Sequence, residues 1–156
     1  MLLNISSSRR MWLRRAAIAA TAAVAVFHVA STGGMVAAYT ASNLEQEPKQ
    51  IALALWHFSA VVVGSIPIAL LWASRAPVEQ ARLLQTYAGL LYAGFSVVTF
   101  PIALREDGLA GLVTMPQGPI FLVLAALIAG GMVPRTTGSI SPAAERFPVS
   151  AGPATG

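Results

Sequence analysis

The chain has 156 residues, of which 56% are hydrophobic and 10% are charged, with a mean hydropathy of +0.68. This charged fraction is well under the roughly 25% of a soluble domain, which indicates an integral membrane protein. The net charge of +4 rests on few charged residues, most of which flank apolar runs. We therefore expect the lipid bilayer as a partner and no nucleic acid. Because the chain has no cysteine, disulfides, iron–sulfur clusters and thiol catalysis are excluded.

Four apolar runs are long enough to cross a hydrocarbon core of about 30 Å, which takes about 20 helical residues. They cover residues 16–40, 51–73, 83–104 and 109–133. Backbone groups in lipid must pair within their own segment, and no period-2 alternation supports a β-barrel, so the fold class is all-α. The connections are short, which makes consecutive helices antiparallel neighbours. We expect a polytopic, up-down bundle of four transmembrane helices within residues 16–134.

The basic residues near the helix ends indicate an orientation, because Lys and Arg are retained on the cytoplasmic side. One side of the bundle would hold Arg9, Arg10, Arg14, Arg15, Arg75, Arg82, Arg135 and Arg146. The other side would hold Lys49 and Arg105. We therefore expect both the N and C termini to be cytoplasmic. Residues 1–15 would be a basic arm, and residues 135–156, rich in Pro, Ala, Gly and Ser, a disordered tail.

The N-terminal arm leaves two alternatives open. Residues 8–14 resemble a twin-arginine export signal, but three more hydrophobic runs follow, which favours a positive-inside anchor. Met11 could also be the true start, and Arg14 and Arg15 would then orient the first helix. The Ala- and Arg-rich composition is typical of a GC-rich bacterium. We therefore expect a multi-pass protein of the bacterial cytoplasmic (inner) membrane.

The fourth apolar run contains Met115-Pro116-Gln117-Gly118-Pro119, which places two prolines and a glycine in one stretch. Either the helix begins only at Pro119, with residues 109–114 forming an interfacial turn or half-helix, or one kinked helix runs through the whole stretch. The first alternative leaves a span of about 15 residues, which is short for a hydrocarbon core. The pair Gly130-Gly131 is typical of close packing or a helix end.

The two histidines are predicted to lie at one depth in the bilayer. No Asp, Glu, Lys or Arg lies well inside any run, which disfavours carboxylate-driven transport. At about 1.5 Å per residue, His28 lies about 18 Å and His57 about 20 Å from the cytoplasmic boundary. Because the first two helices are antiparallel neighbours, the two imidazoles could face each other or flank a common ligand.

Polar and small residues recur at helical spacing on three runs and predict inward-facing surfaces. The first helix presents Thr21, His28, Ser31, Thr32 and Met35. The second presents His57, Ala60, Gly64 and Ser65, and the third presents Gln85, Gly89, Tyr92, Ser96 and Thr99. The candidate buried polar or ligand site comprises His28, His57, Tyr92, Gln117, Thr32 and Ser96. Gln117 joins this layer only if the fourth helix is continuous.

Three interpretations of this layer stay open. Two neutral imidazoles can coordinate haem iron or a divalent metal, or donate to a quinone carbonyl, with Tyr92 or Gln117 completing the hydrogen-bond shell. The same side chains can instead pair across helix interfaces, or act as a pH sensor. Haem b would need room for a macrocycle between adjacent helices, and zinc would need a third or fourth ligand. No catalytic residue is expected, because no acid at depth orients a histidine.

Several short motifs resemble those of a group of small bacterial four-helix membrane proteins. They are Phe27-His28 followed by Gly33-Gly34, then Leu55-Trp56-His57-Phe58, and Pro116-Gln117 before the last span. In that group a first-helix histidine precedes a Gly-Glu or Gly-Gly pair, and a Trp-His pair opens the second helix. The resemblance implies the four-helix topology and emphasises His28, Trp56 and His57. Gly34 stands where many members have an acid, so no His-acid pair is carried over.

We expect a binding or accessory component of the membrane, and not an enzyme, centred on the layer of His28 and His57. One alternative is a redox-associated protein that holds haem or contacts quinone through these histidines. Another is small-molecule transport by a homo-oligomer, because four short helices rarely enclose a pathway alone. The expected partner is another membrane protein or further copies of this chain.

Overall fold

The structure of the chain, a computed structural model, describes residues 6–132. Within that range every regular element is helical, so the all-α class is confirmed there. Three stretches are long and apolar enough to cross a membrane, namely Ser7–Ala41, Gln46–Ala73 and Val78–Thr114. The tail predicted at residues 135–156 and the first five residues of the basic arm lie outside the described residues.

The first long stretch consists of α1 (Ser7–Ala30) and α2 (Thr32–Ala41). The hydroxyl of Ser6 caps α1 by accepting a hydrogen bond from the backbone N–H of Arg9 at 3.4 Å. The interruption falls at Ser31, where two side chains bond back to carbonyls four residues earlier: Ser31 to Phe27 at 2.8 Å and Thr32 to His28 at 3.3 Å. Such back-bonding weakens and bends helices, which accounts for a break at this position.

The next two helices are α3 (Gln46–Ala73) and α4 (Val78–Asp107), joined by a tight turn. Both extend beyond the apolar runs because a helix continues through polar interfacial residues until a breaker stops it. Pro77 precedes α4, and Gly108 ends it with a φ of +58°, a conformation that glycine adopts without steric cost.

The fourth apolar run is interrupted, in agreement with the first of the two alternatives predicted from the sequence. It forms a short 3₁₀ turn, η1 (Gly108–Ala110), then α5 (Gly111–Thr114) and, after a break, α6 (Gln117–Gly130). Met115, with φ of −122° and ψ of 71°, leaves the helical region directly before Pro116. Pro119 then lies in the first turn of α6, where its missing N–H costs nothing. With 14 residues, α6 is only about 21 Å long.

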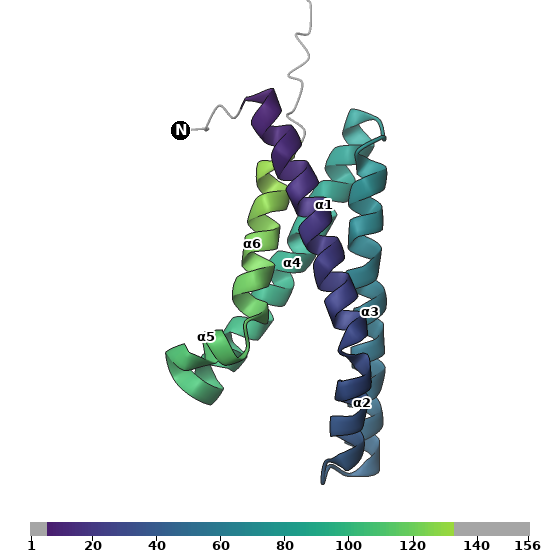
Figure 1. The fold of residues 1–156 in the computed structure, drawn as a ribbon, viewed down its shortest axis with the longest axis vertical. Coiled ribbons are helices and arrows are strands. Elements are labelled where there is room, and N and C mark those ends of the chain that lie inside the picture. Colours follow the sequence, from purple (N-terminus) through teal and green to yellow (C-terminus); the bar gives the residue numbers. More distant parts are fainter. Residues whose placement is uncertain (1–5, 133–156) are drawn as a thin grey trace, which may run out of the picture.

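The four longer helices form a ring in which each contacts two others. The contacts join α1 to α3 and α6, and α4 to α3 and α6 (Figure 1). Consecutive long helices run in opposite directions, so the start of α1, the α3–α4 turn and the end of α6 lie at one end (Figure 1). Toward the other end the α1/α2–α3 pair diverges from the α4–α6 pair (Figure 1). The core comprises Ala17, Ile66, Leu70, Ala88, Tyr92, Leu124 and Ile128.

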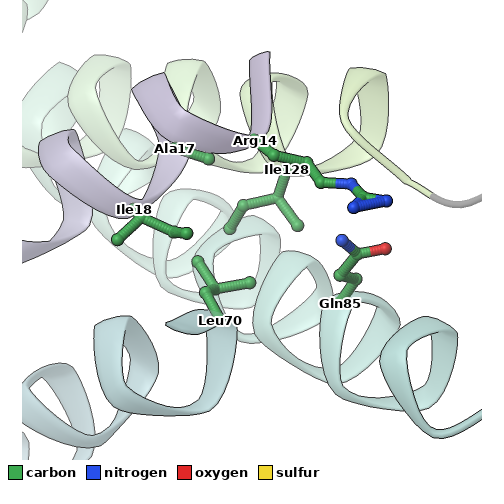
Figure 2. A pocket seen from close by; sticks show the side chains of 6 residues that line it. All are labelled: Arg14, Ala17, Ile18, Leu70, Gln85 and Ile128. Atoms are coloured by element: carbon green, nitrogen blue, oxygen red, sulfur yellow. The ribbon is translucent and has the colours of Figure 1, made fainter. Parts of the chain in front are cut away.

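Arg14 connects α1 and α6 at the end of the ring where α1 begins and α6 ends. Its Nε donates to the carbonyl of Gly131 at 3.0 Å, directly after the end of α6. A Cβ at Gly131 would lie 3.0 Å from the backbone nitrogen of Arg14, so glycine permits this approach. Figure 2 shows Arg14 and Gln85 reaching toward each other across a cavity of about 10 Å³. The predicted role of Gly130-Gly131 in packing at a helix end is confirmed.

Candidate functional site

A larger cavity, of about 250 Å³, lies between α1, α3, α4 and α6. Each of these four helices contributes one aromatic side chain to its wall: Phe27, Trp56, Phe95 and Phe121. Its polar side chains are His28, Ser31, Ser59 and Gln117. The cavity therefore combines an apolar interior with a small number of hydrogen-bonding groups, which is typical of ligand pockets.

His28 is fixed in this wall by a stacking contact with Trp56. The two rings are 4.1 Å apart between centroids and nearly parallel, with an interplanar angle of 16°. The indole Nε1 of Trp56 in turn donates to the hydroxyl of Thr32 at 3.1 Å. Because Thr32 donates to the carbonyl of His28, one hydrogen-bonded loop joins α1, α2 and α3 around the imidazole.

Ser59 lies one turn beyond Trp56 on α3 and completes the surroundings of the imidazole. Its hydroxyl is 3.1 Å from Nε2 of His28 and donates to the carbonyl of Trp56 at 2.7 Å. The same Nε2 is 3.5 Å from that carbonyl. The imidazole is thus held on one side by ring stacking and at Nε2 by hydrogen bonds, so its orientation in the cavity wall is defined.

Ser59 is not among the site residues predicted from the sequence, although the sequence contains one signal for it. Trp56, Ser59 and Val63 follow one another at spacings of three and four residues and continue into the buried Ile66 and Leu70. This periodicity is the usual mark of an inward-facing helix stripe. It was masked by the competing stripe that begins one residue later, at His57.

His57 lies elsewhere. Its side chain is exposed, and it is not among the residues that line the cavity. Successive residues on a helix are about 100° apart, so a helix that turns Trp56 and Ser59 inward turns His57 away. Of the predicted inward face of His57, Ala60, Gly64 and Ser65, His57 and Ser65 are exposed whereas Ala60 and Gly64 are half-buried. The predicted inward orientation of His57 is therefore wrong, and the structure does not bring the two imidazoles together. A Cβ at Gly64 would meet no atom within 4 Å.

The predicted stripe on the third run is confirmed as the buried face of α4. Gln85, Tyr92 and Ser96 are all buried, and the hydroxyl of Ser96 donates to the carbonyl of Gly118 at 2.9 Å, which connects α4 to the start of α6. Tyr92 packs against Phe121, with 5.5 Å between ring centroids. Its hydroxyl has no hydrogen-bond partner among residues 6–132. These side chains lie behind the cavity wall rather than in it.

The six predicted site residues therefore divide into four groups. His28 and Gln117 line the cavity, although they come from separate helices and Gln117 begins α6 rather than lying inside a continuous span. Thr32 supports the wall through Trp56. Tyr92 and Ser96 belong to the interior of the ring, and His57 to its outer surface.

The residues of the cavity do not fit a bis-histidine haem site, because the second histidine is on the outer surface of α3. Over residues 6–132 no group of three or more His, Cys, Asp or Glu side chains is placed to hold a metal ion. What the wall offers chemically is one imidazole, two hydroxyls and one amide beside aromatic surfaces.

Comparison with protein-family models, curated proteins and solved structures gives no match for this chain. The resemblance to small four-helix membrane proteins therefore stays a prediction. The cavity beside His28 is the feature from which a function can be argued.

Proposed function

We propose that this chain is a multi-pass protein of a bacterial inner membrane that binds a small, mainly apolar molecule in the cavity beside His28. In this proposal α6, together with η1 and α5, makes a fourth crossing beside the three long apolar stretches. The short α6 would then be accommodated by local thinning of the bilayer or by the interfacial segment before it.

The distribution of basic residues supports the proposed orientation. Arg14 lies in the first half of α1, Arg75 in the α3–α4 turn and Arg82 near the start of α4, whereas Lys49 lies in the first turn of α3 and Arg105 in the last turn of α4. The start of α1 and the α3–α4 turn lie at the opposite end of the molecule from the start of α3 (Figure 1). Since basic residues are retained on the cytoplasmic side, that first end, and with it both termini, is assigned to the cytoplasm.

The single observation that carries the proposal is the composition of the cavity wall. Aromatic and aliphatic side chains supply most of the wall, and its polar groups are those of His28, Ser31, Ser59 and Gln117. Ligand pockets combine a mainly apolar lining with a few placed polar groups and measure roughly 300–1,000 Å³. At about 250 Å³, this cavity suits a molecule of one or two fused rings rather than a haem. A quinone or quinol head group is of that size.

The binding test uses Trp56 as its reporter. Trp12 and Trp72 are 68% exposed and lie outside the cavity, so the double variant Trp12→Phe, Trp72→Phe keeps one tryptophan, in the cavity wall. Purified in lipid nanodiscs, this protein is titrated with 2-naphthol, a two-ring molecule with one hydroxyl, and energy transfer from Trp56 is recorded. Saturable transfer is expected.

A matched pair of variants on α1 separates cavity binding from partition into the lipid. Val24 lines the cavity, whereas Val26 is 69% exposed on the same helix. Val24→Phe should fill the cavity and weaken saturable binding by at least about tenfold, while Val26→Phe leaves it unchanged. If both variants bind 2-naphthol like the parent protein, the cavity is not the site and the proposal fails.

The outward face of α3 supports a second candidate function, as an accessory subunit. Ionisable side chains in transmembrane segments almost always face protein or water, yet His57 is exposed among apolar residues such as Leu55 and Phe58. Gly64 and Ser65 lie about two turns further along the same face, and small residues there allow another helix to approach closely. We propose that this face contacts another membrane protein or a second copy of the chain.

Because the chain lacks cysteine, single-cysteine variants test that contact in membranes. Under mild oxidation His57→Cys should form a disulfide-linked dimer if the partner is a second copy. With a reagent that joins its thiol to an amine of the neighbouring protein, it should form a heavier adduct of different mass if the partner is another protein. Phe58→Cys, equally exposed on α3 but on the next face, is the control. Equal cross-linking of both variants, or none of either, contradicts the contact.

A further inference from the structure

The hydrogen bonds around His28 determine which of its ring nitrogens carries the proton. Ser59 has one hydroxyl proton, and its short 2.7 Å contact is with the carbonyl of Trp56, which can only accept. That proton is therefore given to Trp56. The remaining contact of the hydroxyl, 3.1 Å from Nε2 of His28, must then be one in which the imidazole donates.

A second contact gives the same assignment independently of the serine. Nε2 of His28 lies 3.5 Å from the carbonyl oxygen of Trp56, and a carbonyl oxygen has no proton to give. Both neighbours of Nε2 are thus acceptors, which places the proton on Nε2. In the neutral imidazole, Nδ1 then carries a lone pair and acts as an acceptor.

Nδ1 is the ring nitrogen of His28 that has no hydrogen-bond partner among residues 6–132. Within residues 6–132 the hydrogen bonds of His28 through its ring are made by Nε2. A half-turn of the ring about Cβ–Cγ would keep the stack on Trp56 but would place a ring carbon where Nε2 now meets Ser59 and the Trp56 carbonyl, so these hydrogen bonds fix the orientation. A cavity-wall imidazole with a bare acceptor in a low-dielectric setting is complementary to a donor, because an unpaired polar group is costly there.

We propose, on the basis of the proposed function, that the ligand of the His28 cavity is an apolar alcohol or phenol, a class that includes hydroquinones. The hydroxyl of this ligand donates to Nδ1 of His28. A ketone or quinone carbonyl offers no donor and would meet the lone pair of Nδ1 unfavourably. From the sequence, the imidazole could have donated a hydrogen bond to a quinone carbonyl. In the structure it is instead the acceptor toward the ligand, because its own proton is already directed at Ser59 and Trp56.

A further polar group of the cavity, the amide of Gln117, is compatible with this ligand. Gln117, at the start of α6, carries both an amide donor and a carbonyl acceptor. It can therefore donate to the hydroxyl oxygen while His28 accepts the hydroxyl proton. A metal ion is not a comparable occupant, since the described residues supply no group of three metal-ligating side chains.

The test compares two naphthalene derivatives, of which only one has a hydroxyl group that can donate a hydrogen bond. The single-tryptophan protein is titrated with 2-naphthol and with 2-methoxynaphthalene, in which a methyl group replaces the hydroxyl proton. We expect 2-naphthol to bind about tenfold more tightly, as the loss of one hydrogen bond to an acceptor in the cavity wall implies. His28→Phe, which keeps an aromatic ring against Trp56, should reduce this ratio to about one, whereas His57→Phe should leave it at about ten.

The outcomes separate this inference from the proposed function. If both molecules bind equally to the parent protein and Val24→Phe weakens both, the cavity is a ligand site but recognition of a hydroxyl donor is wrong. If neither binds saturably, the proposed function itself fails. If His28→Phe folds and keeps the tenfold preference, another group recognises the hydroxyl and the role of His28 is overturned.

Nitrogen-15 NMR of the histidines gives a test that needs no folded His28 variant. The chain has two histidines, so spectra of the parent protein and of His57→Phe assign both rings. His28 should show a protonated Nε2 and an unprotonated Nδ1, and 2-naphthol should shift the Nδ1 resonance more than 2-methoxynaphthalene does. A proton on Nδ1 in the ligand-free protein would overturn the inference.

Discussion

Gly111 and Gly34 differ in what surrounds them, although both are helical glycines in an apolar protein. A Cβ at Gly111 would collide with the backbone carbonyl of Ala103, whereas a Cβ at Gly34 would meet no atom within 4 Å. The approach of α5 to the end of α4 therefore depends on Gly111 having no side chain. Two alanine substitutions, identical in chemistry, should have opposite effects.

We expect Gly111→Ala to destabilise the protein by about 1–3 kcal/mol or more, because a backbone carbonyl cannot move aside as a side chain can. Gly34→Ala should be neutral or stabilising by up to about 1 kcal/mol, since alanine favours a helix interior. Thermal unfolding of both variants in detergent, followed by circular dichroism, measures the difference. A Gly111→Ala protein that melts with the parent would show that α5 does not pack on α4 as described.

Tyr92 is fully buried, and its hydroxyl has no hydrogen-bond partner among residues 6–132. A buried polar group without a partner costs about 1–3 kcal/mol. Tyr92→Phe keeps the ring packed on Phe121 and should therefore leave stability unchanged or raise it. The melting temperature in detergent is again the readout. A clear decrease would show that the hydroxyl is bonded to a water molecule in the interior.

At the scale of elements, α6 is held at both ends by contacts from other helices. Ser96 on α4 donates to the carbonyl of Gly118 near its start, and Arg14 on α1 donates to the carbonyl of Gly131 at its end. A cation at a helix C-terminus also interacts favourably with the helix dipole. These contacts explain how a 14-residue helix keeps its place beside longer ones.

Removing the contact at the C-terminal end should loosen α6. We expect Arg14→Ala to lower stability by about 1–2 kcal/mol and Arg14→Lys to lower it less, since lysine keeps the charge but not the Nε donor. Arg15→Ala, at the next and exposed position, should have little effect. Hydrogen exchange of the amides in the last turn of α6, compared among the three variants, localises the change. Equal protection in Arg14→Ala and Arg15→Ala would contradict the role of Arg14.

At the scale of the whole molecule, the orientation in the membrane is open to direct labelling, because the chain has no cysteine. Ser74→Cys reports on the α3–α4 turn and Asn43→Cys on the turn between α2 and α3, both at exposed positions. On intact cells stripped of their outer membrane, a membrane-impermeant maleimide should label Asn43→Cys and not Ser74→Cys. The reverse pattern would invert the proposed topology and place the His28 cavity nearer the cytoplasmic side.

Part of the candidate site could be predicted from the sequence, because it depends only on the spacing of residues within one helix. The stripe of Gln85, Tyr92 and Ser96 was recognisable because polar residues at helical spacing in an apolar run have few stable places other than the interior. His28 was singled out as an ionisable residue at depth. Ser59 was not, because it reaches His28 from another helix, and the stripe of Trp56, Ser59 and Val63 competes with the stripe that begins at His57.

Hydropathy and segment length are enough to specify the helical class and the three long membrane-compatible helices, because apolar length and backbone hydrogen bonding are properties of each segment alone. The rotation of α3 about its own axis, which turns Ser59 toward His28 and His57 away from it, is visible only in the folded protein. That rotation depends on packing against α1 and α4 rather than on hydropathy, since nearly every side of α3 is apolar. The structure also decided that the fourth run breaks before α6, because either alternative satisfied the local rules for proline.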